Sequence, residues 1–134
     1  MYAVPLAARR GPRVALLTTY LGDDGQLVHD VVRHGLDGLV IEATGTGHVA
    51  PAVADALAQA AAAMPVVFAS RTGRGEMLRG YYGFEGSELD LHRRGLVRAG
   101  FLDGPKARLL LWAGLAADSG PAAIRAAFAE YGGG

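Results

Sequence analysis

The sequence predicts an α/β fold: a small parallel sheet of about four strands with helices on both faces, a flavodoxin-like or Rossmann-like three-layer arrangement. Apolar runs rich in β-branched residues predict strands over residues 14–20, 38–44 and 65–70. These runs are apolar on both faces, as expected of parallel strands that are covered on both sides. Helical patterns separate the runs, and this β-α-β-α-β order predicts parallel strands joined by right-handed crossovers.

Apolar residues at helical spacing predict the helices. The predicted helices cover residues 26–34, 50–64, 89–94, 105–115 and 121–131. Their ends carry the expected residues: Gly35 suits a helix stop, Pro51 suits a first turn and Ser87 suits an N-cap. A fourth strand is predicted over residues 96–101, and we expect residues 132–134 to form a frayed tail.

The length and charge of the chain limit the classes of function that it can have. A chain of 134 residues without an internal repeat or linker predicts a single domain over residues 1–134. Lys+Arg and Asp+Glu both number 13, which predicts no electrostatic attraction to nucleic acid or to anionic lipid. No apolar run approaches the roughly 20 residues that span a bilayer, and the first residues lack the pattern of a secretory signal. We therefore expect a cytoplasmic protein with neither nucleic acid nor membrane as a partner.

Few residues suit catalysis. The absence of cysteine excludes disulfides, thiolate nucleophiles and cysteine-ligated zinc. No histidine and carboxylate pair has ligand spacing on one face, so we expect no metal and no cofactor. The hydroxyls of Thr18, Thr19, Ser70 and Thr72 lie at the ends of predicted strands, but none lies in a sharp glycine-flanked turn. We assign no catalytic residue.

The turn Gly45-Thr46-Gly47-His48 follows a predicted strand and precedes a predicted helix. It begins a G-x-G-x-x-A pattern, a variant of the dinucleotide fingerprint whose glycines let an anion approach backbone amides. No acidic residue lies about 20 positions further on to hold a ribose hydroxyl. A stand-alone module that binds a small ligand or nucleotide at this turn is an alternative hypothesis.

Residues 73–94 form a glycine-rich connection after a strand, at the position where open α/β sheets bind ligands. Taken alone, the sequence around Glu88 in this connection predicts a solvated charge in the first turn of a short helix. His48 stands apart from His29, His34 and His92, because those three fall on predicted helices and are expected to be partly exposed.

Five motifs, taken in order, resemble the C-terminal domain of the bacterial-type L-asparaginases. Residues 38–48 (GLVIEATGTGH) resemble the family's "DGIV..G.GNGN", and residues 50–57 parallel the helix that follows it. Residues 65–71 (PVVFASR) resemble "VV.SSR", and residues 95–100 (GLVRAG) resemble "YGFVASG". The most specific match is the segment LDGPKARLL, which starts at Leu102 and resembles "L.P.KAR.LL". The resemblance covers residues 12–131 and implies the same four-stranded α/β layer.

The resemblance implies substrate-binding roles for Glu88, His48, Thr46 and Gly47. The position matching Glu88 is the carboxylate that binds the α-amino group of the substrate, L-asparagine or a related amino acid. The position matching His48 is an amide or hydroxyl in the family and helps to orient that carboxylate. A histidine there would make the contact depend on pH, and it leaves the preference between asparagine and glutamine open.

The family's nucleophilic threonine lies in an N-terminal "TGGTI" motif, and nothing in this chain matches "TGGT" or "GTDT". Without a nucleophile and its base, an acyl-enzyme cannot form. The resemblance therefore implies half of an amidohydrolase, inactive until an N-terminal asparaginase domain or a neighbouring subunit completes it. We also expect a homo-oligomer, because the helices over residues 50–64 and 105–115 are apolar around much of their circumference.

Overall fold

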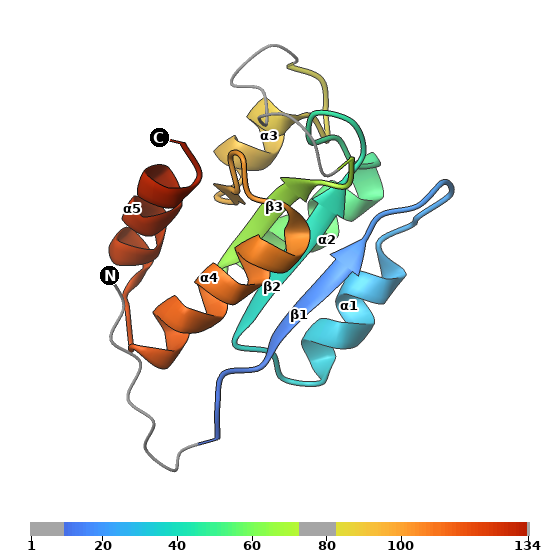
Figure 1. Ribbon diagram of the computed structural model, residues 1–134. Coiled ribbons are helices and arrows are strands. Elements are labelled where there is room, and N and C mark those ends of the chain that lie inside the picture. Colours follow the sequence, from blue (N-terminus) through green and yellow to red (C-terminus); the bar gives the residue numbers. More distant parts are fainter. Residues whose placement is uncertain (1–9, 73–82, 134) are drawn as a thin grey trace.

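The computed structural model describes residues 10–72 and 83–133, shown as the coloured ribbon in Figure 1. The prediction for the glycine-rich connection can thus be followed only from Gly83 onward, since residues 73–82 lie outside the described residues. The elements, in chain order, are β1 (Val14–Thr18), α1 (Gln26–Arg33), β2 (Gly38–Ala43), α2 (Pro51–Ala61), β3 (Val66–Ser70), α3 (Glu88–Arg93), β4 (Val97–Arg98), α4 (Gly104–Ala116) and α5 (Pro121–Tyr131).

The four strands form one parallel sheet in the order β1-β2-β3-β4, which confirms the predicted fold class. Val14 lies opposite Gly38, Leu39 lies opposite Val66, and the short strand β4 is in register with Val67. Because all the strand pairs are parallel, all four carboxyl ends lie at one edge of the sheet. The connections that leave this edge are the segments at which the sequence predicts ligand binding.

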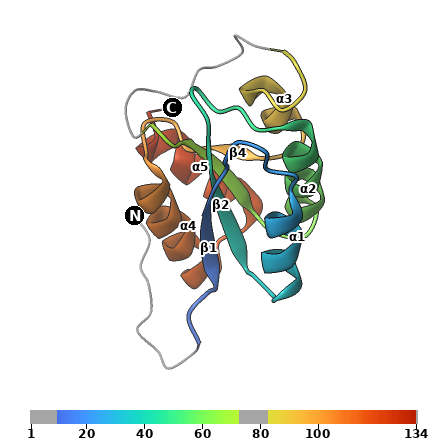
Figure 2. The same ribbon diagram turned by 90° about the vertical axis from the view of Figure 1, so that its right-hand side faces the viewer.

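Helices cover both faces of the sheet, so the arrangement has three layers (Figure 2). One core lies under α1 and α2 and is built around Leu39, Ile41 and Phe68. The other core lies under α4 and α5 and contains Val40 and Val67. Successive residues of β2 thus point to opposite cores, as a strand requires, and this explains its continuous apolar run.

Among the predictions that differ from the structure, two concern the C-terminal part of the chain. The strand predicted over residues 96–101 is only β4, because the chain turns after it: Gly100 has φ +65° and Leu102 N–H donates to Ala99 O at 3.2 Å. The expectation of a frayed tail is wrong for Gly132, which is buried and whose carbonyl accepts from Phe101 N–H at 2.8 Å.

Candidate functional site

The carboxyl edge of the sheet brings together two connections that are far apart in the sequence. The β2–α2 connection carries His48, and Glu88 is the first residue of α3, which lies at the same end of the sheet (Figure 1). The Nε2 atom of His48 lies 3.6 Å from the Oε2 atom of Glu88. Two of the four residues to which the resemblance gives binding roles, His48 and Glu88, are therefore neighbours.

The turn that carries His48 closes on itself. The backbone of Thr44 pairs with that of His48 in an antiparallel bridge, with N–H to O distances of 2.9 Å in both directions. Gly47 N–H also donates to Thr44 O, at 3.0 Å. The amides of Gly47 and His48 are thus engaged within the turn, and α2 begins at Pro51, which has no N–H. This geometry weighs against a phosphate cradle, which needs amides directed at the ligand.

The His48 ring is held from two sides. Its Nε2 atom lies 2.8 Å from Thr46 Oγ1, and the ring stacks on Phe84 with centroids 5.0 Å apart and planes 15° apart. A proton on Nε2 would point its dipole toward the carboxylate of Glu88, which favours that tautomer. The ring is therefore oriented so that its Nε2 edge faces both Thr46 and Glu88.

Glu88 is fully buried, so its interpretation as a solvated charge is wrong. The loop before it folds over the β2–α2 connection: Val49 N–H donates to Gly86 O at 2.9 Å. Gly86 has φ +82°, and a Cβ atom there would lie 2.2 Å from Val49 O, so this close approach needs glycine. Ser87 caps α3 as predicted, its hydroxyl accepting from Asp90 N–H at 3.4 Å.

Arg94 fastens α3 in place, and the sequence interpretation missed it. Its guanidinium bonds the carboxylates of Asp90 at 2.8 Å, Asp55 at 2.6 Å and Glu85 at 3.3 Å. The hydrogen bond with Asp55 raises the pKa of Arg94, and the other charge–charge contacts act in the same direction. The available signal was the spacing of Asp90 and Arg94, which places them one helical turn apart. Asp90 also accepts from Gly86 N–H at 2.8 Å, which links this network to the loop before Glu88.

The hydroxyls at the strand ends have local partners. Ser70 Oγ donates to Gly45 O at 2.5 Å and so braces the turn that carries His48. Thr18 Oγ1 donates to Glu42 at 2.6 Å, and Thr19 Oγ1 donates to Asp23 at 3.1 Å. Across residues 10–72 and 83–133, none of these three hydroxyls bonds a histidine.

Two kinds of feature are absent from the described part of the chain. It contains no group of three or more His, Asp or Glu residues placed to hold a metal ion. None of its helices combines the length and the apolar character needed to cross a membrane. His29, His34 and His92 are at least partly exposed there, as predicted.

Comparison with known proteins identifies the family. Residues 13–128 match the Glutaminase/Asparaginase C-terminal domain. The chain is 40% identical over 99 residues to the probable L-asparaginase of Deinococcus radiodurans, covering 74% of this chain and 30% of that protein. It is 32% identical over 101 residues to the L-asparaginase of Bacillus licheniformis, covering 75% of this chain and 31% of that protein. The chain thus spans about three tenths of the length of these relatives. Because the match covers most of its own length, the chain belongs to the Glutaminase/Asparaginase C-terminal domain family.

Proposed function

We propose that this chain is the substrate-completing part of an amidohydrolase of the L-asparaginase type, in which Glu88 binds the α-amino group of L-asparagine or a related amino acid. The observation that carries the proposal is a fully buried carboxylate beside His48 at the carboxyl edge of the sheet. In such a low-dielectric position, a carboxylate forms a strong charge-assisted hydrogen bond with an ammonium group. Two relatives named as L-asparaginases support the choice of ligand.

The neighbouring residues have supporting roles in this proposal. His48 orients the Glu88 carboxylate, Thr46 holds the imidazole at 2.8 Å, and Gly47 (φ +117°) gives the turn a backbone conformation that side chains rarely adopt. Because Glu88 is buried, an ammonium group reaches it only when a covering side chain moves. The His48 side chain is 20% exposed and lies beside the carboxylate, so we propose that it makes this movement.

The hydrolytic step needs groups from elsewhere. The hydroxyls of Thr18, Thr19 and Ser70 have local partners and make no hydrogen bond with a histidine within the described residues. We therefore propose that the nucleophilic threonine comes from an N-terminal asparaginase domain or a neighbouring subunit, and that the chain alone releases no ammonia. Homo-oligomer formation and a cytoplasmic location are parts of the same proposal.

The test joins the chain to a nucleophile. The 134-residue chain replaces the matching C-terminal segment of the Bacillus licheniformis L-asparaginase, and ammonia release from L-asparagine and L-glutamine is measured. We expect turnover by the chimera, strong loss in Glu88→Gln, and little change in Glu85→Gln, whose side chain is 57% exposed. The isolated chain serves as the second arm: ammonia release that Glu88→Gln abolishes there would refute the need for a second part.

A further inference from the structure

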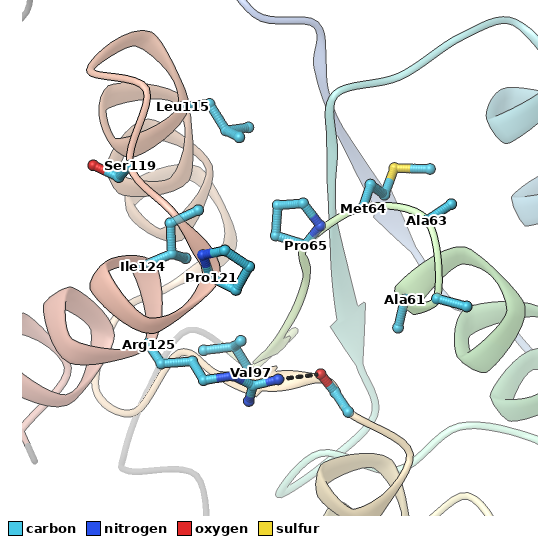
Figure 3. Close-up of a pocket in the computed structure, with 12 residues that line it drawn as sticks. Ala61, Ala63, Met64, Pro65, Val97, Leu115, Ser119, Pro121, Ile124 and Arg125 are labelled. Carbon is cyan, nitrogen blue, oxygen red and sulfur yellow. Dashed lines mark hydrogen bonds between the residues drawn. The ribbon is translucent and has the colours of Figure 1, made fainter.

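A pocket lies at the other end of the sheet, away from Glu88 and His48. It has a volume of about 360 Å³ and lies between the end of α2, the end of α4 and the start of α5 (Figure 3). In the view of Figure 3, Pro121 and Ile124 of α5 face Pro65, which precedes β3. Its volume falls within the range of about 300–1,000 Å³ that is usual for small-molecule sites.

The walls of this pocket are mostly apolar and carry two polar side chains, Ser119 and Arg125. Ala61, Met64 and Pro65 line one side, Leu115 and Ile124 line the other, and Arg125 carries the only charge on the lining. An apolar lining with one fixed charged group is the usual composition of a pocket that orients a small organic ligand.

Arg125 is held in position but keeps donors for a ligand. Its Nη2 atom donates to Gly95 O at 3.1 Å, and the dashed line in Figure 3 marks this bond. A guanidinium group has five N–H donors, so the bond to Gly95 leaves most of them available. Among residues 10–72 and 83–133, no carboxylate lies within ion-pair distance of Arg125.

The charge of Arg125 acts on its neighbours. The pKa of His92 is lowered first by burial and then by the positive charges of Arg98 and Arg125, the latter being the lining residue. The charge of Arg125 attracts an anion and disfavours a ligand with a free ammonium group.

We propose that this pocket binds a small organic monoanion with an apolar body, such as an arylalkanoate, whose carboxylate pairs with Arg125. The planar guanidinium matches a carboxylate, and the alanine, methionine and proline walls match the apolar body. A phosphate or dicarboxylate is a poorer fit, because Arg125 is the one cationic side chain on the lining and a second negative charge would have no cationic partner there. A zwitterionic amino acid is also a poorer fit, since no acidic side chain lines the pocket.

The test uses the Met64 methyl group as a reporter. Met64 lines the pocket, and the other methionines of the chain are Met1 and Met77. The 134-residue chain is labelled at its methionine methyl groups and titrated with 3-phenylpropanoate, with 3-phenylpropan-1-ol and with L-asparagine. We expect a saturable shift of the Met64 resonance with the carboxylate at millimolar concentration, and binding of the alcohol about tenfold weaker or less.

Variants separate the charge from the apolar walls. Arg125→Met is expected to weaken 3-phenylpropanoate binding by about tenfold, and Arg125→Lys to restore part of it. Arg93→Met, at another exposed helical arginine, is the matched control and is expected to leave binding unchanged. The proposal is overturned by the absence of a saturable shift, by an Arg125→Met variant that binds normally, or by equal binding of alcohol and carboxylate. The last result would mark the hollow as an apolar docking surface instead.

Discussion

The backbone N–H of Val49 donates a hydrogen bond to the carbonyl oxygen of Gly86 at 2.9 Å. Val49 follows His48 directly, and Gly86 lies two residues before Glu88. This bond therefore fixes the two connections of the candidate site to each other through their backbones. The position of the Glu88 carboxylate beside the imidazole depends on the close approach at Gly86.

Gly86→Ala is expected to lower the free energy of unfolding by about 3 kcal/mol, because the new Cβ would press on Val49 O and the backbone has positive φ. Gly35→Ala is the matched control, since Gly35 also has positive φ (+80°) but has nothing within 4 Å of the added Cβ. It is expected to cost about 1 kcal/mol from backbone strain alone. Urea unfolding measures both, and equal losses would mean that the contact at Val49 is unimportant.

Arg94→Met is expected to lower the free energy of unfolding by about 1–2 kcal/mol, because three carboxylates of α3, α2 and the preceding loop lose their shared partner. The comparison is Arg33→Met, which removes a single ion pair with Asp30 from a side chain that is 69% exposed. Such a surface pair contributes little to stability, because water and salt screen both charges. If urea unfolding gave the two variants the same stability, the Arg94 network would have no special role.

Truncation after Tyr131 is expected to destabilise the chain by about 1 kcal/mol, because Phe101 N–H loses its acceptor, Gly132 O. Truncation after Gly133 removes only Gly134 and is the control, with no measurable loss expected. The two truncated chains are compared by thermal unfolding. If truncation after Tyr131 caused no loss of stability, Gly132 would contribute nothing to the fold, as expected of a frayed tail.

The pKa of His92 in the folded chain lies below the ordinary histidine value of 6.5, chiefly because of burial. Below pH 6.5 the unfolded chain therefore takes up this proton more readily than the folded chain does. The contribution of His92 to stability is thus complete above pH 6.5 and is lost as the pH falls from there through the folded-state pKa. Urea unfolding from about pH 5 to 8 should show a smaller loss on acidification in His92→Gln than in the unsubstituted chain. An unchanged slope would contradict the cause assigned to the shift.

The elements with local signals were predictable from the sequence. The helix predicted over residues 121–131 is α5 with the same bounds, because Pro121 begins it and an amphipathic pattern continues it. The apolar run of β2 likewise predicted a strand that is buried on both faces. In both cases the residues that decide the structure are close together in the sequence.

Features of the site that depend on contacts between distant segments were not predictable in this way. The sequence around Glu88 predicts a capped helix start, and nothing within a few residues of Glu88 indicates that its side chain is buried. That burial comes with the approach of Gly86 to Val49, and the bonds of Arg94 to Asp55 join separate helices. The family resemblance brought Glu88 and His48 into one hypothesis, and the structure places their side chains 3.6 Å apart.

The sequential strand order has a consequence for how the chain is made. Each strand pairs with the one that the ribosome produced just before it, so the sheet can grow during synthesis without waiting for distant segments. The connections that carry His48 and Glu88 emerge before α4 and α5, which cover Val40 and Val67 on the second face. A nascent chain that pauses before α4 would thus have an assembled carboxyl edge of the sheet, while one apolar face of the sheet would still be uncovered. Such an intermediate would be prone to aggregation and would be a natural client for a chaperone.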